Sequence, residues 1–242
     1  MRNKPVPAVS AEDAAYVRSF LLYEDADILV FNKPSGLPSQ GGANITRSLD
    51  SLLDAFAKSN GKRPRLVHRL DTQTSGIMIV ARTKPAAASL SLQFSERKAK
   101  KTYLALVSGD VDEAANRVID QALVKVRESG RPRMLAAKPG RQGAQTAVTK
   151  VRVLARSETA SLVALSPETG RMHQLRIHMA HIGHPILGDP LYGKGHADAS
   201  RLMLHAAELG LAHPSGEALK LMAELPEAFV AEVQSRGLQA GL

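Results

Sequence analysis

The sequence predicts an α+β fold, with a mostly antiparallel mixed sheet flanked by helices and loops. Short apolar runs recur along the 242-residue chain and end near Gly or Pro, which is typical of buried strands followed by turns. Helical periodicity appears in separate segments, and the predicted strands outnumber the helices. The spacing of the strands is too irregular for a series of β-α-β units, which argues against a regularly wound parallel sheet.

Six apolar runs are expected to form strands. In chain order they are 28–31, 76–81, 102–109, 151–154, 161–165 and 208–214. A further short apolar segment covers 201–206. Gly109 is expected to stop the third strand, and a polar turn joins the fourth strand to the fifth.

Four segments show the one-sided apolar spacing of an amphipathic helix. Their apolar residues are Leu49, Leu52, Leu53 and Phe56; Leu90 and Phe94; Met172, Leu175, Met179 and Ile182; and Phe229 and Val233. Thr46 and Thr169 are expected to cap the first and third of these helices. Pro85 and Pro226 are expected to open the second and fourth, because proline is well tolerated in a first helical turn.

The chain is expected to comprise a flexible N-terminal arm over residues 1–20 and one domain over 21–242. The arm carries two prolines and mixed charge with weak patterning. The N-terminus lacks the apolar core of a signal peptide, and no run approaches the roughly 20 apolar residues of a membrane span. We therefore expect a cytoplasmic protein without membrane contact, with a monomer as the default state.

Composition narrows the classes of function. Hydrophobic residues make up 44% and charged residues 23% of the chain, as in globular proteins. The absence of Cys excludes disulfides, a thiol nucleophile and a Cys-based zinc site. The net charge of +9 and a pI near 9.9 favour a polyanionic partner, nucleic acid first and an anionic membrane second.

Residues 125–141 form the most basic segment of the chain. They contain one acid, Glu128, and the six cations Lys125, Arg127, Arg131, Arg133, Lys138 and Arg141. A solvated hairpin with a charged tip would explain this composition. We favour a basic finger that contacts phosphates, with Arg131 and Arg133 at its centre.

Three common chemistries lack support in the sequence. His173, His178, His181 and His184 do not repeat at the spacing of a helical zinc site, so no metal is expected. The glycines of PSGLPSQGG match neither nucleotide-binding motif. No GxSxG motif for a serine nucleophile occurs.

Asp71 stands alone in the segment HRLDTQTSG, directly before an apolar strand. A carboxylate at a strand edge is partly desolvated, and an arginine partner would keep it ionised. Such a carboxylate can act as a nucleophile or a base. It can equally cap a turn by accepting hydrogen bonds from the following backbone N–H groups, and the segment on its own favours that role.

Several segments together resemble the RluA family of pseudouridine synthases. HRLDTQTSG is similar to the family signature HRLDxxTSG. The others, in the family's order, are DILVFNKPSGLPSQGG, KAKKTYLALVSG, TGRMHQLRIHMAHIGHPILGDPLYG and RLMLHAAELGLAHPSGE. The resemblance runs from about Tyr23 to Phe229, and the ordered set is highly specific.

The resemblance implies the pseudouridine synthase fold and isomerisation of uridine to pseudouridine in RNA without a cofactor. Asp71 matches the catalytic aspartate, and Arg176 matches the arginine that pairs with it. Tyr103 matches the tyrosine that stacks on the target base. Arg69 matches the residue that enters the RNA stack after the uridine has flipped out. Further RNA contacts are expected from Arg65, His68, Arg131, Arg133 and His173.

Many relatives carry an N-terminal S4-like RNA-binding domain, whereas only about 20 residues precede Tyr23 here. We therefore expect the catalytic domain itself to make additional contacts with RNA. The expected substrate is ribosomal or transfer RNA. The alternative is a non-catalytic RNA-binding protein or RNA chaperone, for which Asp71, Tyr103 and Arg176 would be dispensable.

Overall fold

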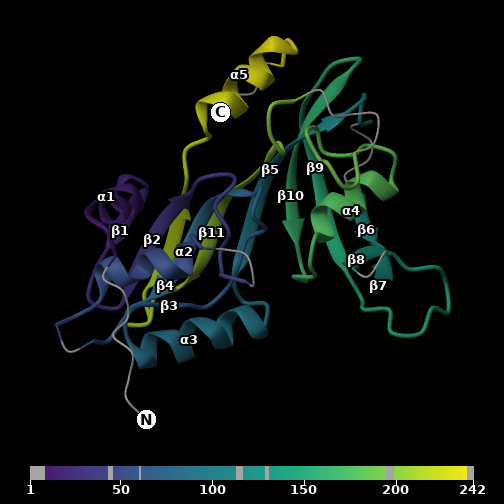
Figure 1. Cartoon of the computed structure of the whole chain (residues 1–242). Helices are drawn as coiled ribbons and strands as arrows, with labels where there is room; N and C mark the ends of the chain where they lie inside the picture. Colours follow the sequence, from purple (N-terminus) through teal and green to yellow (C-terminus); the bar gives the residue numbers. More distant parts are fainter. Residues whose placement is uncertain are drawn as a thin grey trace. The chain divides into compact units, whose positions relative to one another are not determined.

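The computed structural model describes residues 9–42, 46–59, 61–112, 117–128, 131–193 and 199–238. Its fold class is α+β with a large, mostly antiparallel sheet, which confirms the prediction (Figure 1). The chain divides into two compact units, Met1–Lys98 with Leu211–Leu219 (unit 1) and Ala99–Gly210 with Lys220–Leu242 (unit 2). No helix in the described part of the chain is both long enough and apolar enough to span a bilayer.

Unit 1 is built on short antiparallel strands. They are β1 (Leu21–Glu24), β2 (Ile28–Lys33), β3 (Arg65–Leu66) and β4 (Ser75–Ala81). β2 pairs with β1 and β4, and β3 also pairs with β4. Every residue of β4 is buried, so this strand forms the centre of the unit.

The helices of unit 1 pack on these strands. They are α1 (Ala11–Ser19), α2 (Leu49–Leu52), the 3-10 turn η1 (Leu53–Phe56) and α3 (Lys84–Ser95). α3 lies against β4, as Figure 1 shows. Thr83 caps α3 through a hydrogen bond from the Ala86 N–H, and Pro85 stands in the first turn as predicted.

Helix α1 covers residues 11–19 of the flexible arm expected over residues 1–20. Ser10 caps it by accepting from the Asp13 N–H at 3.0 Å, and Val17 is fully buried. The helix is mainly polar and exposed, so its single buried anchor leaves no apolar stripe for sequence analysis to detect. Residues 1–8 of the expected arm lie outside the described residues.

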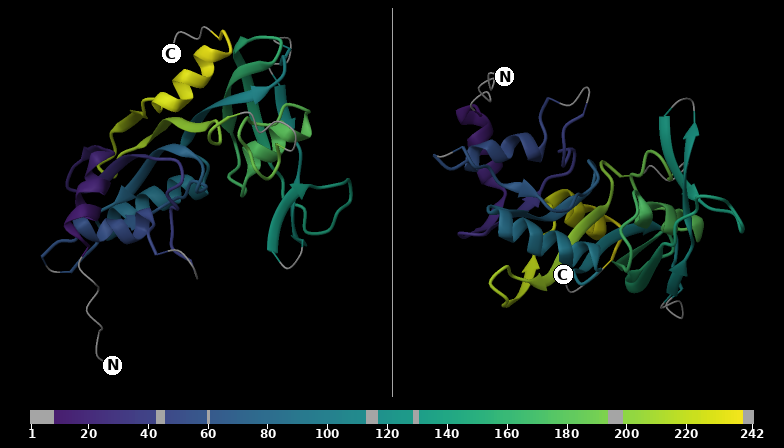
Figure 2. Two further views of the ribbon diagram at one scale, coloured as in Figure 1. Left: turned by 45° about the horizontal axis from the view of Figure 1, so that its top comes forward. Right: turned by 90° about the horizontal axis from the view of Figure 1, so that it is seen from below.

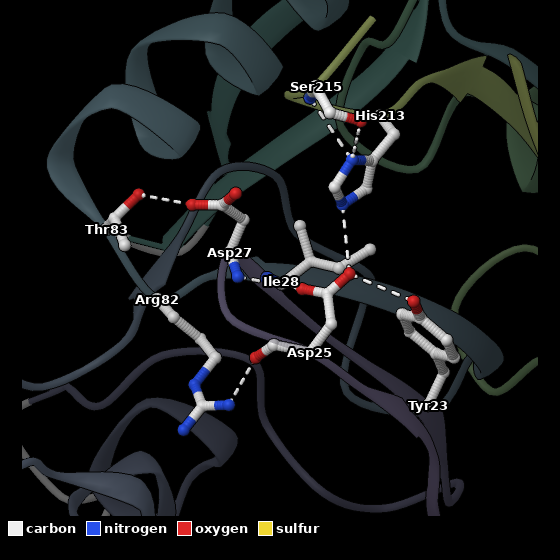
Figure 3. Close-up of polar contacts among 8 residues, drawn as sticks. All are labelled: Tyr23, Asp25, Asp27, Ile28, Arg82, Thr83, His213 and Ser215. Atoms are coloured by element: carbon white, nitrogen blue, oxygen red, sulfur yellow. Dashed lines mark hydrogen bonds and ion pairs between the residues drawn. The ribbon is translucent and has the colours of Figure 1, made fainter. Parts of the chain in front are cut away.

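Asp25 organises the turn between β1 and β2 (Figure 3). Its carboxylate accepts hydrogen bonds from the N–H groups of Asp27 and Ile28, both at 2.8 Å, and from the Tyr23 hydroxyl at 3.0 Å. Partial burial raises the pKa of Asp25, but the hydrogen bonds from Ile28, Asp27 and Tyr23 outweigh burial and hold this pKa below its usual value. The carboxylate also contacts His213 Nε2 at 3.0 Å.

Within unit 1, the contact with His213 fastens the turn after β11 to the turn between β1 and β2. His213 Nδ1 accepts from the Ser215 N–H at 3.1 Å, so Nε2 carries the proton that is donated to Asp25. This cluster therefore has a structural role: it holds two loops of one unit together.

Unit 2 contains the remaining larger strands. They are β5 (Lys100–Ser108), β6 (Arg117–Asp120), β9 (Val148–Arg156), β10 (Ala160–Pro167) and β11 (Leu204–Ala212), whose last two residues belong to unit 1. Their order is β11-β5-β10-β9-β6, and neighbouring strands in this order are antiparallel. β12 (Ala218–Met222) pairs with β11.

The core of unit 2 forms around β5 and β10. Leu106, Val107, Leu162 and Val163 are fully inaccessible to solvent. Helix α5 (Glu227–Ser235) adds the buried side chains of Phe229 and Val233 to this core, as its spacing predicts. Helix α4 (Gln174–His181) adds Leu175 and Met179.

The expected basic finger is a two-stranded hairpin of β7 (Leu123–Glu128) and β8 (Arg131–Ala136), which forms a separate small sheet. Figure 2 shows this hairpin and the following loop standing away from the larger sheet of unit 2. Its base packs on α4, where Leu123 and Met134 join a small apolar cluster with Ile177. The hairpin therefore has a fixed base, and Lys125 and Arg127 of β7 are exposed.

The two segments expected at 201–206 and 208–214 are largely one strand, β11. His205 lies within it, fully buried, and its Nε2 donates to the Ala223 carbonyl at 3.3 Å. Burial lowers the pKa of His205 from 6.5 to about 4, because the charged ring would lose its hydration. The neutral ring is thus part of the folded structure at neutral pH.

His205 makes stability depend on pH in a defined window. Its pKa is lower in the folded chain than in the unfolded chain, so its contribution is complete above 6.5 and is lost as pH falls toward about 4. Between about pH 7 and pH 4.5 the wild type should lose on the order of 2 kcal/mol that a His205→Gln variant retains. Urea denaturation of both proteins at the two pH values measures this, and parallel pH profiles would contradict it.

Candidate active site

Asp71 lies in the loop that joins β3 to β4 in unit 1. Its side chain is half-buried, whereas Leu70 before it and Thr74 after it are buried. The Thr74 N–H donates to the Asp71 main-chain carbonyl at 3.1 Å, which closes a turn. The carboxylate is therefore carried by a short loop that is anchored at both ends.

The loop at residues 34–39, which follows β2, holds the Asp71 loop through main-chain atoms. Ser39 Oγ donates to the Leu70 carbonyl at 2.6 Å and accepts from the Leu70 N–H at 3.0 Å. The Gly36 N–H donates to the Thr72 carbonyl at 2.9 Å. Gly36 has φ +87°, a conformation that favours glycine, so this residue lets the loop turn toward Thr72.

Lys33 completes this connection from inside the unit. Its side chain is fully buried, and the ammonium donates to the carbonyls of Pro34, Leu37 and Thr72 at 2.9, 2.8 and 3.2 Å. Burying a charged group is costly unless its hydrogen bonds are made. Lys33 thus binds the 34–39 loop to the Asp71 loop in one arrangement.

The other predicted residues of this segment differ in exposure. His68 is half-buried: its ring stacks on Phe94, with centroids 4.4 Å apart, and Nε2 accepts from the Ile79 N–H at 3.0 Å. These two contacts hold the His68 ring within unit 1. Arg65 and Arg69 are exposed on either side of it, so their guanidinium groups are available to a partner.

Tyr103 lies on β5 in unit 2, across from Leu165 of β10 and Ala206 of β11. Its half-buried ring packs against the apolar core of the unit. Strand pairing on both sides fixes the backbone at Tyr103, so the ring has a defined position in the sheet.

Arg176 lies on α4 and forms a buried, two-pronged ion pair with Asp189. Nε donates to one carboxylate oxygen at 2.7 Å and Nη2 to the other at 2.6 Å. The two side chains are 4% and 0% exposed, so water does not screen the pair. Burial raises the pKa of Asp189, but the hydrogen bonds and charge of Arg176 reverse this and hold the pKa below its usual value.

The turn after Asp189 brings a second aromatic ring to Arg176. Asp189 accepts from the N–H groups of Leu191 and Tyr192 at 2.8 and 3.1 Å, which fixes the turn. The guanidinium carbon of Arg176 lies 5.2 Å from the Tyr192 ring centroid, within cation–π range. One carboxylate thus orients both Arg176 and Tyr192.

His173 also contacts Tyr192. The Tyr192 hydroxyl donates to the Met134 carbonyl at 3.1 Å, so it accepts the proton of His173 Nδ1 at 2.9 Å. His173 caps α4 in the left-handed region, at φ +57°, a conformation that is uncommon for a residue other than glycine. The bond to Tyr192 helps to hold this strained residue in place.

The two named arginines of the basic finger lie on β8. Arg131 begins the strand. Arg133 pairs with Glu128, donates from Nη2 to the Leu191 carbonyl at 3.1 Å and faces the Tyr192 ring at 5.7 Å. Arg133 therefore anchors the hairpin. The exposed cations of the segment are Lys125, Arg127, Lys138 and Arg141.

His173, His178 and His184 around α4 have structural partners in the described residues. His178 is buried and contacts the Gln121 carbonyl at 3.0 Å, and burial lowers its pKa. His184 contacts the Ser108 carbonyl at 2.9 Å. No group of three His, Cys, Asp or Glu suited to a metal ion occurs among the residues that the structure describes.

Comparison with known proteins places these residues in a family. Residues 27–181 match the family model described as RNA pseudouridylate synthase, which is more than half of the chain. The chain belongs to this family. The matched range contains Asp71, Tyr103 and Arg176. The protein is therefore a pseudouridine synthase, an isomerase, and the predicted resemblance is confirmed.

Curated relatives and solved structures agree with this assignment. The chain is 35% identical to ribosomal large subunit pseudouridine synthase D of Zymomonas mobilis, covering 92% of this chain and 74% of that protein. It is 36% identical to ribosomal large subunit pseudouridine synthase C of Escherichia coli K12, covering 94% and 73%. The structure of human RNA pseudouridylate synthase domain containing 4 matches with a TM-score of 0.77 at 29% identity, over 93% and 96% of the two chains.

Three residues near the predicted site residues were given no role in the sequence analysis. Lys33, Asp189 and Tyr192 fix the surroundings of Asp71 and Arg176 through buried contacts. Each occurs in a segment that resembles the family, NKPSG or GDPLYG, so the motifs contained a signal. Their partners are distant in sequence, which is why the motifs alone did not reveal the contacts.

The buried ammonium of Lys33 can be tested directly. A Lys33→Met variant should lose about 2 to 4 kcal/mol of its free energy of unfolding, because three carbonyls lose their donor. The turnover rate of the folded fraction should fall by about 10- to 100-fold as the Asp71 loop loosens. Denaturant titration and single-turnover kinetics measure the two effects.

The exposed Lys58 provides the matched control for this substitution. A Lys58→Met variant should stay within about 0.5 kcal/mol of the wild type. Equal stability of the two variants would show that the buried ammonium does not hold the loops.

The ion pair of Arg176 offers a second test. Asp189→Asn should lower the free energy of unfolding by about 3 kcal/mol, because a buried guanidinium would lose its counter-charge. Asp110→Asn breaks an exposed pair with Arg156 and should cost less than about 1 kcal/mol. The pKa of Asp189 is lowered, so its contribution persists above pH 3.8 and disappears only as pH falls further. Similar losses in both variants would contradict this account.

Proposed function

We propose that this synthase modifies uridine in ribosomal RNA, with Asp71, Tyr103 and Arg176 as its catalytic residues. Support for the substrate class comes from the relatives, whose names specify the large ribosomal subunit, and from the net charge of +9. The alternative substrate is transfer RNA, which the same assay would detect.

The observation that carries this proposal is the fixed position of the Asp71 loop. The main-chain atoms of Leu70 and Thr72, on either side of Asp71, are bonded to Ser39, Gly36 and Lys33. A turn that served only to cap a strand would not need a buried ammonium behind it. A carboxylate that must meet one carbon atom of a nucleotide does need such positioning.

Arg176 enters the proposed mechanism as the arginine that the family resemblance pairs with the catalytic aspartate. Asp189 engages Nε and Nη2 and so holds the guanidinium plane in one orientation. The carboxylate of Asp71 is proposed to act as the nucleophile or as the base.

The reaction is balanced within the nucleotide. The C1′–N1 bond breaks and the C1′–C5 bond forms; a proton leaves C5 and a proton is gained at N1. No water enters the product, so the detached base must be kept in place during its rotation. Tyr103 provides a ring on which the base stacks and a hydroxyl for the proton transfer at C5.

The target uridine must flip out of the helical stack of the RNA, which costs a few kcal/mol. Arg69 is exposed next to the anchored Leu70 and would fill the gap that the uridine leaves. Phosphate contacts are proposed for Arg65 and Arg131, and for the exposed cations of the β7–β8 hairpin. His68, His173 and Arg133 would support RNA binding mainly by holding neighbouring elements.

Replacement of the carboxylate tests the proposal. Asp71→Asn should abolish pseudouridine formation on ribosomal transcripts while the Kd for the same RNA changes less than about threefold, because one neutralised side chain leaves the phosphate contacts intact. Asp110→Asn, the exposed control, should retain activity. Pseudouridine is quantified by mass spectrometry of digested RNA, with transfer RNA transcripts assayed in parallel.

Full activity of Asp71→Asn would refute the catalytic assignment. If the wild type modified none of the transcripts but bound them tightly, the alternative of a non-catalytic RNA-binding protein would replace the proposal. Modification of transfer RNA alone would correct the substrate class and leave the assignment of Asp71 in place.

A further inference from the structure

One face of the unit 2 sheet carries a feature that the proposed reaction does not use. Tyr103 pairs with Leu165, and Leu165 pairs with Val151, so these three share one face of β5, β10 and β9. Successive side chains of a strand alternate between faces. The residues next to them in sequence, which include Thr102 and Lys150, therefore lie on the face opposite Tyr103.

This opposite face is hollowed. A depression of about 350 Å³ is lined by Thr102, Arg117, Val118, Lys150, Val151, Arg152, Ala164 and Ser166. All three charged residues of this lining, Arg117, Lys150 and Arg152, are cations. Its size is within the range of pockets that hold small ligands or parts of larger ones.

The cations are available to a partner. Arg117 and Arg152 are exposed, and neither has an acidic partner among the residues that the structure describes. Lys150 pairs with Glu168 at 2.8 Å, but both side chains are about half exposed or more, at 61% and 49%. An exposed pair of this kind is weak, so a stronger anion can displace Glu168.

The floor of the hollow adds neutral donors. Thr102 and Ser166 carry hydroxyl groups, and both side chains are partly exposed. Arginine, lysine and hydroxyl side chains are the groups that contact phosphate oxygens in nucleic-acid complexes. The set matches a phosphodiester backbone better than a carboxylate-bearing peptide, because the hydroxyls add donors suited to several oxygens on one phosphate.

We propose that this hollow, formed on strands β5, β6, β9 and β10, binds a phosphodiester segment of the RNA substrate remote from the uridine that is modified. The inference rests on the proposed function, because it takes the substrate RNA as the occupant. The contact is remote because Thr102, Lys150 and Arg152 of the hollow lie on the face opposite Tyr103. Arg117 pairs with Val151 and therefore lines the hollow from the edge of the sheet, on the Tyr103 side. β6 is the edge strand and contributes Arg117, so an RNA can reach the hollow around that edge.

The structure thereby assigns a role in substrate selection. A short stem-loop that contains the uridine would occupy only the catalytic face. A large folded RNA would contact both faces and gain affinity from the hollow. The enzyme would then prefer long, folded RNA over a minimal fragment, without reading any base in the hollow.

The test compares two double variants of the full chain with equal charge change. Lys150→Gln with Arg152→Gln removes the two cations of the hollow that lie on the face opposite Tyr103. Lys58→Gln with Lys84→Gln removes two exposed cations of unit 1 as the control. KM and kcat are measured on a long ribosomal transcript that the wild type modifies, and on the short stem-loop around the modified uridine.

The hollow variant should raise KM for the long transcript about tenfold, leave kcat unchanged and leave the stem-loop kinetics unchanged. Its binding of the long RNA should depend less on salt, with the slope of log K against log salt reduced by about 1 to 2. The control variant should match the wild type in the long-to-short ratio of KM. Unchanged melting temperatures confirm that both variants are folded.

Equal effects on the two RNAs, or no effect on either, would overturn the inference. So would loss of polyglutamate binding in the hollow variant with RNA binding unchanged, since that result would indicate an acidic protein partner. Failure of the proposed function would look different, because the wild type itself would then modify neither RNA.

Discussion

The buried ammonium of Lys33 is the interaction on which the account of the active site depends. It lies inside unit 1 and donates to three main-chain carbonyls, one of which belongs to Thr72, directly after Asp71. Carbonyl oxygens that face a buried cation cannot move away without leaving its charge unsatisfied. The position of the Asp71 loop is thus determined by a buried residue of the neighbouring strand.

In unit 2 a buried charge also fixes its neighbours through hydrogen bonds, but this charge is negative. There Asp189 is the buried charge, and it orients Arg176 through two hydrogen bonds and Tyr192 through the backbone of the turn. Tyr192 in turn holds His173 and the base of the β7–β8 hairpin. In each unit one buried ion thus fixes the surroundings of a proposed catalytic residue, Asp71 or Arg176, which is how preorganised sites are commonly supported.

The sequence predicted the parts of the fold that local pattern determines. The strands at 28–31, 76–81 and 161–165 and the helices opened by Pro85 and Pro226 lie where apolar spacing placed them. The helix-capping residues were predicted less well. Ser48, and not Thr46, caps α2. Thr169 bonds to the Gln174 side chain at 2.7 Å, and His173 takes the cap position of α4. These choices depend on which side chain tertiary packing brings to the helix end.

For the site, the motifs predict Asp71, Tyr103 and Arg176, because the resemblance covers all three positions. The buried partners could not be found this way. Thr72 lies 39 residues from Lys33, and Asp189 lies 13 residues from Arg176, so both contacts exist only in the folded chain. The hollow opposite Tyr103 is likewise invisible in sequence, since Arg117 and Arg152 become neighbours only when β6 and β9 enter one sheet.

The central claim is that the anchored carboxylate of Asp71 isomerises uridine in ribosomal RNA. The most direct measurement is pseudouridine mapping of cellular RNA in cells that lack this gene and are complemented with wild type or with Asp71→Asn. We predict that one or a few ribosomal sites lose pseudouridine and that the wild type alone restores them. Restoration of the same sites by Asp71→Asn would contradict the claim.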